Sequence, residues 1–352
     1  FKLLLIPYAL APMIHAVLLG TNMGLFTVAG TSVLGCYLLP EKAILPYLVM
    51  SALCGLVAVL VTRQVRKRGR LLRAGFFVGA SALLLALSFN VISLQPLIQG
   101  GMIEWQAFGI QMASIFGTGL VTGMIVSGLL PVLESSFTLT TDISWLELSD
   151  LNHKLLRRMQ LEAPGTFHHS MVVASLAETA AETIGANPTV CRVCSYFHDI
   201  GKLNKPEYFA ENGPQARERH ALLAPEMSML IISAHTRDGV ELGRYYGLPN
   251  ALLAFMVEHH GTSCIEYFYQ QAEALRGEDQ VSEGSFRYSG RRPQSKETAI
   301  VMIADAAEAI ARQMTDPSIG RLQEMVHRVS MKRLMDSQFS ECALTLAELD
   351  TI

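Results

Sequence analysis

The chain lacks several features by which common classes of protein are recognised. Its 352 residues carry a net charge of −3, so the basic excess typical of general nucleic-acid binders is missing, and we expect no nucleic-acid partner. The six cysteines are scattered, without the density of a disulfide scaffold. Cys191 and Cys194 form a lone Cys-x-x-Cys pair, which favours buried helical cysteines over a zinc or redox site.

Charged residues are scarce in residues 1–133, where five apolar runs approach the length of a membrane-spanning helix, about 20 residues. The runs lie near residues 3–20, 23–39, 43–61, 72–94 and 107–133. A basic cluster separates the third run from the fourth and consists of Arg63, Arg66, Lys67, Arg68, Arg70 and Arg73. By the positive-inside rule this connection is cytoplasmic, which places everything after Leu133 in the cytoplasm. We therefore predict a multi-pass protein of the cell membrane, with residues 1–133 forming a transmembrane helical region in the lipid bilayer.

The same topology puts Phe1 and the short connections 41–42 and 99–104 on the external side. Because the chain begins with Phe1 and not with Met, we expect that an upstream part is missing. Glycines in the last run suit close helix packing in lipid, and they are Gly109, Gly117, Gly119, Gly123 and Gly128. A neutral His15 within the first run is explained by pairing inside a helix bundle. The region is typical of an anchor or a sensor.

Residues 134–150 are mixed and polar, and we predict a linker there, followed by a helical domain over 151–352. No alternating strand pattern of useful length appears, so the predicted fold class is all-α, a transmembrane helix bundle followed by a cytoplasmic helical domain. Capping residues predict helices from Thr166 to Gly185, from Asn187 to His198 and from Ser295 to about 313. Others are expected over 151–161, 225–235, 236–246 and 250–260, with a loop over 272–295 and a further helix opening at Asp316.

A histidine and an aspartate stand side by side at the end of one of these helices, as His198-Asp199-Ile200-Gly201-Lys202. Adjacent side chains share a site only where the chain turns, and Gly201 is expected to supply that turn. Imidazole and carboxylate groups are suited to metal binding, and a carboxylate can bridge two cations. The dipeptide is common, however, so its meaning depends on whether the chain supplies further ligands.

Further candidate ligands stand at helix ends or inside apolar helices: His169, His235, His259, His260 and Asp305. Asp305 lies in an apolar helix, where an unpaired carboxylate would be costly to bury unless a cation offsets it. A single histidine at a helix end is also explained by a favourable charge against the helix dipole. Applied independently to these five residues and to His198 and Asp199, that explanation becomes improbable. Two metals and one bridging carboxylate are the usual arrangement for activating water against a phosphodiester.

The order His, His-Asp, His, His-His, Asp resembles the HD-domain metal-dependent phosphohydrolases. The motifs are Gly165-Thr166-Phe167-His168-His169-Ser170, Tyr196-Phe197-His198-Asp199-Ile200-Gly201-Lys202, Ser233-Ala234-His235, Glu258-His259-His260-Gly261-Thr262-Ser263 and Ile303-Ala304-Asp305. The set is similar to the 7TMR-HD family of membrane proteins, the PgpH-type cyclic di-AMP phosphodiesterases. The resemblance implies a cyclic dinucleotide substrate, hydrolysis of cyclic di-AMP to pApA, and two divalent metal ions, iron or manganese. On the basis of the same resemblance, we expect His169 and not His168 to be the first metal ligand.

The resemblance implies that His169, His198, Asp199 and Asp305 hold one metal, and that Asp199 bridges to a second metal held by His235, His259 and His260. Asp199 and Lys202 are the expected catalytic residues, with Lys202 contacting phosphate or assisting the leaving oxygen. Lys202 as a solvated helix-end residue is the alternative. Substrate contacts are expected from Lys202, Arg287, Tyr288, Arg291 and Arg292, against the alternative of a solvated loop. A homodimer is one expectation for the oligomeric state, which the sequence leaves open.

Two other functions are alternatives to cyclic di-AMP hydrolysis. The protein could be an HD hydrolase of another nucleotide, such as an alarmone or a dNTP, or a receptor that binds nucleotide without hydrolysing it. The motif after His259-His260 is Gly-Thr-Ser with no Gly-Tyr-Pro, unlike the HD-GYP enzymes that act on cyclic di-GMP. The family also carries an extracellular domain before its membrane block, and a C-terminal continuation, so we expect that the chain is trimmed at both ends.

Overall fold

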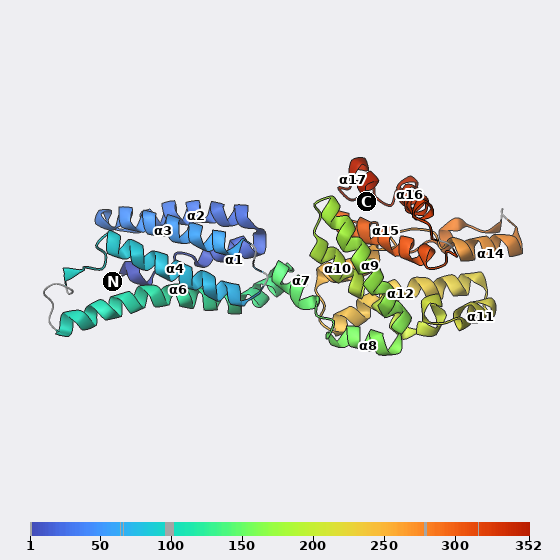
Figure 1. Cartoon of the computed structure of the whole chain (residues 1–352), viewed down its shortest axis with the longest axis horizontal. Coiled ribbons are helices and arrows are strands. Elements are labelled where there is room, and N and C mark those ends of the chain that lie inside the picture. The colour runs from blue at the N-terminus through green and yellow to red at the C-terminus, as the bar shows by residue number, and fades with distance from the viewer. Residues whose placement is uncertain (1, 64, 66, 96–101, 278–279, 316) are drawn as a thin grey trace. The chain divides into compact units, whose positions relative to one another are not determined.

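A computed structural model describes residues 2–352 apart from 64, 66, 96–101, 278–279 and 316 (Figure 1). The predicted start at Phe1, Arg66 of the basic cluster, residues 99–101 of the external connection and the helix opening at Asp316 therefore lie outside the described residues. Apart from one isolated bridge between Cys264 and Arg287, regular structure in the described part is helical, which confirms the all-α fold class. Contacts divide the chain into two compact units, Phe1–Ser144 and Trp145–Ile352.

The first unit is a bundle of apolar helices. Its elements are η1 (Lys2–Leu5), α1 (Leu10–Leu19), α2 (Thr21–Cys36), α3 (Glu41–Thr62), α4 (Gly69–Ser88) and α6 (Met102–Phe137). Among the described residues, three helices are long and apolar enough to span a membrane, and they correspond to the third, fourth and fifth predicted runs. The first two runs form the shorter helices α1 and α2, so the count of five spans stays a prediction. These helices make the unit a membrane region.

Small residues let two of these helices approach closely. A Cβ atom added at Gly119 of α6 would lie 2.4 Å from the backbone nitrogen of Gly79 in α4, and one at Gly75 would lie 2.6 Å from the carbonyl oxygen of Gly119. Glycine is therefore needed where α4 crosses α6. By contrast, a Cβ atom added at Gly109, Gly117 or Gly128 would meet no described atom within 4 Å, so packing among the described residues does not explain these glycines.

Residues 134–150 are more helical than the predicted linker suggested. Helix α6 runs on to Phe137, and α7 (Asp142–Leu148) follows it. The Glu134 carboxylate accepts hydrogen bonds from the Thr141 backbone N–H at 2.9 Å and the Ser144 hydroxyl at 2.8 Å, so α6 and the start of α7 are tied together. Along the chain, the division between the two units falls within this segment, and the predicted boundaries at 133 and 150 stay a prediction.

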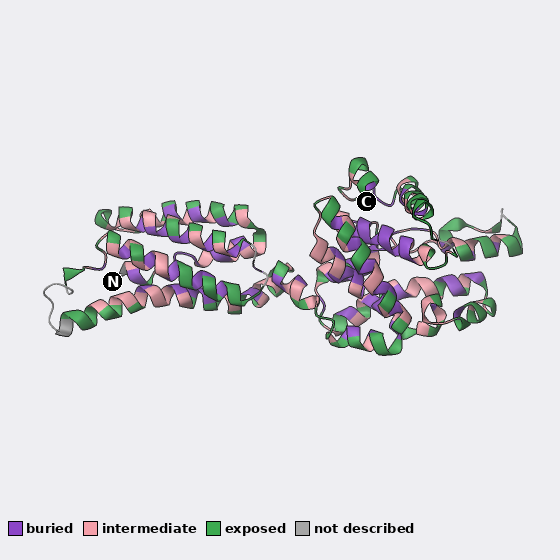
Figure 2. Ribbon diagram, viewed as in Figure 1, coloured by how far each residue is buried: buried purple, intermediate pink, exposed green. Residues whose placement is uncertain are grey.

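The second unit contains α15 (Lys296–Ala311), which packs against three other helices, α9, α10 and α16. The other elements are α8 (Lys154–Glu162), α9 (Pro164–Thr183), α10 (Pro188–Phe197), η2 (Ile200–Asn204), η3 (Pro206–Tyr208), η4 (Ala210–Asn212), α11 (Gln215–Ala221), α12 (Pro225–Tyr245), α13 (Asn250–Glu258), α14 (Glu266–Arg276), η6 (Glu283–Phe286), α16 (Ile319–Met335) and α17 (Leu346–Thr351). Figure 2 shows α15 as buried along most of its length. The apolar core that fixes α9, α10, α13 and α15 includes the fully buried Phe197, Met256 and Ile300.

Local capping explains several of these boundaries. The side chains of Asn187 and Ser295 accept hydrogen bonds from Val190 and Thr298 backbone N–H groups, as expected of N-caps. Gly185 and Gly247 end their helices with positive φ angles of 68° and 73°.

Four expectations about local structure are wrong. Helix α12 is continuous, so no helix ends at His235; no proline interrupts it, and Gly239 within it packs against another backbone. Residues 272–276 belong to α14, because Phe268 and Ala272 give that segment a buried face. Thr166 lies inside α9, which begins at Pro164. Gly201 has no positive φ, and close contact is the reason it is glycine.

Candidate metal centre

Five helical elements bring the predicted ligands together. His198 caps the end of α10, Asp199 follows it, and His259 and His260 follow the end of α13. His169, His235 and Asp305 project from within α9, α12 and α15. All these side chains are buried except His260, which is partly exposed, whereas the neighbouring His168 is exposed. The ligand atoms form two groups, each within 4.8 Å: His169, His198 and Asp305, and Asp199, His235, His259 and His260.

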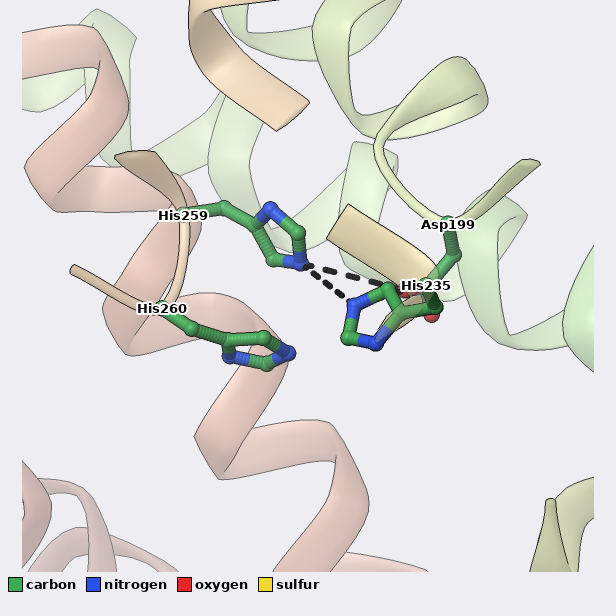
Figure 3. Close-up of side chains that lie close together, drawn as sticks. All are labelled: Asp199, His235, His259 and His260. Carbon is green, nitrogen blue, oxygen red and sulfur yellow. Dashed lines mark hydrogen bonds and ion pairs between the residues drawn. The ribbon is translucent and has the colours of Figure 1, made fainter. Parts of the chain in front are cut away.

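Asp199 faces both groups with different oxygens. Its Oδ2 lies 3.3 Å from His198 Nε2 and 3.6 Å from His169 Nε2. Its Oδ1 lies 3.4 Å from His235 Nε2 and 3.8 Å from His259 Nε2 (Figure 3). One carboxylate therefore stands between two clusters of imidazole nitrogens, which is the position of a bridging ligand.

Asp305 closes the first group. Its Oδ1 lies 3.0 Å from His169 Nε2 and 3.9 Å from His198 Nε2, and its Oδ2 lies 3.5 Å from His260 Nδ1. The groups are therefore neighbours, with carboxylates at Asp199 and Asp305 between the imidazoles. This division matches the two sets implied by the family resemblance, although the roles of the residues as ligands stay a prediction.

In four of the histidines Nδ1, one of the two ring nitrogens, already has a hydrogen-bonding partner. Nδ1 of His198, His235 and His259 donates to backbone carbonyls of Ser195 at 2.7 Å, Ile232 at 2.5 Å and Met256 at 3.0 Å. Nδ1 of His169 contacts the buried carboxylate of Glu308. In a neutral ring with a protonated Nδ1, Nε2 presents its lone pair, and all four Nε2 atoms point inward.

The centre contains buried polar atoms that the described residues leave without hydrogen bonds, namely Oδ1 of Asp199 and Nε2 of His198, whereas Oδ2 of Asp199 is ion-paired with Lys202. In addition, Nε2 of His235 and Nε2 of His259 face each other at 3.3 Å (Figure 3). Two lone pairs at that distance repel unless a proton or a cation lies between them. Burying such groups unpaired costs several kcal/mol, about 1–3 for each lost partner. The donor set therefore fits bound cations.

Burial and charge set protonation states that suit metal binding at Asp199, His259 and His260 but oppose it at His198. Burial alone would raise the pKa of Asp199, but His198 and Lys202 hold it well below its usual range. Burial lowers the pKa of His259 to about 3 and that of His260 well below its ordinary value. Burial lowers the pKa of His198 too, but Asp199 outweighs it and raises that pKa to about 10. An ionised carboxylate and neutral imidazoles are the forms that bind metals, so metal and proton compete at His198.

Lys202 is not solvated. Its Nζ lies 2.6 Å from Asp199 Oδ2, 2.8 Å from Glu211 Oε1 and 5.0 Å from the centre of the Phe209 ring. Burial would lower the pKa of Lys202, but these carboxylates raise it above its ordinary value, so the ammonium stays charged. The alternative of a solvated lysine at a helix end is therefore wrong.

A cavity of about 310 Å³ opens over the centre. His169, His235, His260, Asp305 and Lys202 line it. Tyr288 also lines it and stacks on His260 with 4.3 Å between ring centres. A hollow of this size, in which Lys202, Arg312 and Arg333 supply positive charge beside the predicted metal ligands, suits a small anionic ligand.

The three arginines predicted to contact substrate lie elsewhere. Arg287 forms a two-point ion pair with Asp336, at 2.8 and 3.1 Å, and also contacts Glu283. Arg291 donates to Gln294, and Arg292 donates to Ser340, and neither lines the cavity. Their nearness in sequence to the helix of Asp305 does not bring them to the centre.

Sequence reasoning missed four residues of the site. Glu308 contacts His169, and Glu211 contacts Lys202. Arg312 and Arg333 supply the guanidinium groups of the cavity wall. Glu308 carried a usable signal, because it is a second carboxylate in the apolar helix of Asp305, three residues further on.

Comparisons with known proteins agree with this geometry. Residues 1–141 match a family model described as 7TM receptor with intracellular HD hydrolase, and residues 166–310 match the HD domain. The cyclic-di-AMP phosphodiesterase PgpH of Bacillus subtilis (strain 168) is 40% identical over 85% of this chain and 41% of its own length. PgpH of Listeria monocytogenes (serotype 1/2a, strain 10403S) is 35% identical over 99% of this chain and 47% of its own. The chain thus spans less than half of each curated relative.

The crystal structure of the L. monocytogenes PgpH HD domain in complex with cyclic-di-AMP is also similar. It is 41% identical, with a TM-score of 0.55, and the match covers 58% of this chain and 94% of that one. Both family models match in succession, and the solved HD domain is covered almost completely. The chain therefore belongs to the 7TMR-HD family, the 7TM receptors with an intracellular HD hydrolase.

Proposed function

We propose that the chain is a membrane-anchored, metal-dependent phosphodiesterase that hydrolyses cyclic di-AMP to pApA. The observation that carries the proposal is the arrangement of two ligand groups on either side of Asp199. Support for the substrate comes from relatives, since the two PgpH proteins described above are named cyclic-di-AMP phosphodiesterases, and a 41% identical HD domain was solved with cyclic-di-AMP.

Two divalent ions, iron or manganese, would be held by His169, His198 and Asp305 on one side and by His235, His259 and His260 on the other. Asp199 would bridge them. Bound at such a site, the pair of ions supplies activated water and offsets negative charge on the phosphodiester.

Lys202 would act beside the ions. Its ammonium, held by Asp199 and Glu211, lines the cavity and keeps its proton. It therefore cannot serve as a base. A fixed positive charge there would stabilise negative charge that develops on the substrate, either on a phosphate oxygen or on the leaving oxygen. Tyr288, stacked on His260, also lines the cavity and would contact the substrate.

The membrane region would place the HD domain in the cytoplasm and regulate it. The basic connection between α3 and α4 supports this orientation by the positive-inside rule. The expected homodimer stays a prediction, which light scattering of the chain in detergent tests.

A substrate panel tests the function. The full chain in detergent, loaded with manganese or iron, is expected to convert cyclic di-AMP to pApA and to leave alarmones and dNTPs largely intact. Turnover confined to an alarmone or a dNTP would favour another HD hydrolase. Binding of cyclic di-AMP without any turnover would favour the receptor.

Asp199→Ala tests the site independently of the substrate. Loss of the shared carboxylate should remove both metals and abolish turnover, with metal content measured by mass spectrometry on the purified chain. Retention of two metals per chain by this variant would refute the assigned centre.

A further inference from the structure

A second hollow adjoins the cavity over the metal centre. Its volume is about 350 Å³, and it shares Glu211 and Arg312 with the cavity. Arg217 of α11 and Gln313 complete its polar lining. The two hollows together exceed the room that one phosphate group and its sugar require, and each falls within the usual size range of a ligand pocket.

Arg312, the C-cap residue that follows α15, continues the face of that helix on which Asp305 stands. It lies seven residues further on, two helical turns or roughly 10 Å along the axis. Ala309, between them on that face, also lines the cavity. The guanidinium is thus carried on the helix that holds the metal ligand, at the boundary of the two hollows.

In the part of the chain that the structure describes, no hydrogen bond or ion pair is formed by the Arg312 guanidinium, and Glu308, one helical turn earlier, contacts His169 instead. Arg217 is likewise without one among those residues. Among the described residues, Glu211 is the one carboxylate that lines the second hollow, and it is already committed to the Lys202 ammonium at 2.8 Å and the Thr166 hydroxyl at 3.2 Å. The described lining of the second hollow is therefore electropositive.

A cyclic dinucleotide contains two phosphodiesters, and the metal centre accommodates one of them for hydrolysis. The other must lie elsewhere in the bound molecule. A guanidinium offers paired donors that match phosphate oxygens, so an uncompensated arginine beside the centre is chemically suited to that group. Arg333 is the other arginine of the cavity wall. Its positive charge interacts with the Asp336 carboxylate, so the charge of Arg333 is partly compensated.

We propose that Arg312, with Arg217 behind it, binds the phosphodiester that is not cleaved, and so makes the centre selective for substrates with two phosphates. The proposal rests on the function proposed above. It assigns the second hollow to the distal half of the substrate. It also predicts that a diester with a single phosphate gains nothing from Arg312.

The test compares Arg312→Ala, Arg312→Lys and Arg217→Ala with the unmodified full chain in detergent. Arg328→Ala, an exposed residue of α16 paired only with Glu324 among the described residues, is the matched control. Each protein is assayed with cyclic di-AMP and with bis(p-nitrophenyl) phosphate, which has one phosphate. Metal content per chain is measured in parallel, so that a damaged centre is recognised.

Arg312→Ala is expected to raise KM for cyclic di-AMP about 10- to 100-fold, the loss of a charge-assisted contact, with kcat changed far less. Its kcat/KM for bis(p-nitrophenyl) phosphate should stay within about twofold. Arg312→Lys should recover part of the affinity, and Arg217→Ala should give a smaller rise in KM.

Two results would overturn the proposal: unchanged kinetics of Arg312→Ala with cyclic di-AMP, or an equal loss with both substrates. A failure of the proposed function is recognised separately. In that case the unmodified chain hydrolyses bis(p-nitrophenyl) phosphate and does not hydrolyse cyclic di-AMP, and the assignment of the second hollow falls with it.

Discussion

Replacing Gly201 by alanine tests whether the metal centre depends on a close backbone contact. A Cβ atom at this position would lie 1.9 Å from the carbonyl oxygen of His235 and 2.5 Å from the backbone nitrogen of Gly239. Both atoms belong to the backbone of α12 and cannot rotate away. Since φ at Gly201 is not positive, alanine suits the local backbone, and the whole cost lies in this contact.

The size of the required shift follows from the same distances. Ordinary contact begins at 3.4 Å, so η2 and α12 must separate by roughly 1.5 Å. Asp199 lies just before η2, and His235 belongs to α12. The distance of 3.4 Å between Asp199 Oδ1 and His235 Nε2 would therefore widen by a similar amount. Metal sites tolerate errors of about 0.2 Å in ligand distance. We therefore expect loss of at least one metal and destabilisation by about 1–3 kcal/mol from overpacking.

Gly239→Ala is the matched control, because it adds the same methyl group to the other side of the contact. Its Cβ would lie 3.4 Å from Gly201 and 3.6 Å from Met256, which is ordinary packing. In a helix interior alanine is also favoured over glycine by about 0.5–1 kcal/mol.

The assay is metal content by mass spectrometry together with thermal unfolding, on the full chain in detergent. The unmodified chain and Gly239→Ala should hold two metals, and Gly201→Ala at most one, with a lower Tm. A Gly201→Ala protein with two metals and an unchanged Tm would refute the reasoning.

Two further predictions concern the surroundings of the centre. Glu308→Gln removes the negative charge beside His169 Nδ1, so chelator competition should show about 10- to 100-fold weaker binding of one of the two metals; equal retention of both would contradict this role. His153 caps α8 by accepting from the Leu155 N–H at 3.3 Å, and burial lowers the pKa of this histidine. The unfolded chain then takes up the proton more readily, so the contribution to stability is complete above about pH 6.5 and is lost as the pH falls below that value. His153→Asn keeps a cap that does not titrate and should flatten the fall of Tm at acidic pH; identical slopes in the two proteins would disprove the effect.

What the sequence predicted well was either local or carried by the family resemblance. The caps at Asn187 and Ser295 depend on side chains that bond a backbone three residues away, so a short window contains the whole cause. The two ligand groups were assigned from motifs, and their gathering in space required the fold.

The failures share a different cause, which is contact between segments distant in the chain. Arg287 was expected at the substrate, but its partner Asp336 lies 49 residues away. Glu211 reaches Lys202 from short 3₁₀ turns, which have no periodicity to read. Gly201 was expected to be glycine for its backbone angles, whereas the reason is a neighbour 34 residues further along. None of these causes is visible in a local window.

The helix ends themselves explain why His198 and His259 are suited to metals. The last four carbonyls of an α-helix have no partner within the helix, and Ser195 and Met256 belong to the last four residues of α10 and α13. A histidine that immediately follows the helix can donate its Nδ1 proton to such a carbonyl, as both do at 2.7 and 3.0 Å. The helix thereby satisfies an orphan acceptor and fixes the tautomer that leaves Nε2 unprotonated. Termination of α10 at His198 also lets Asp199 turn inward, so the same break that ends the helix creates the bridging position.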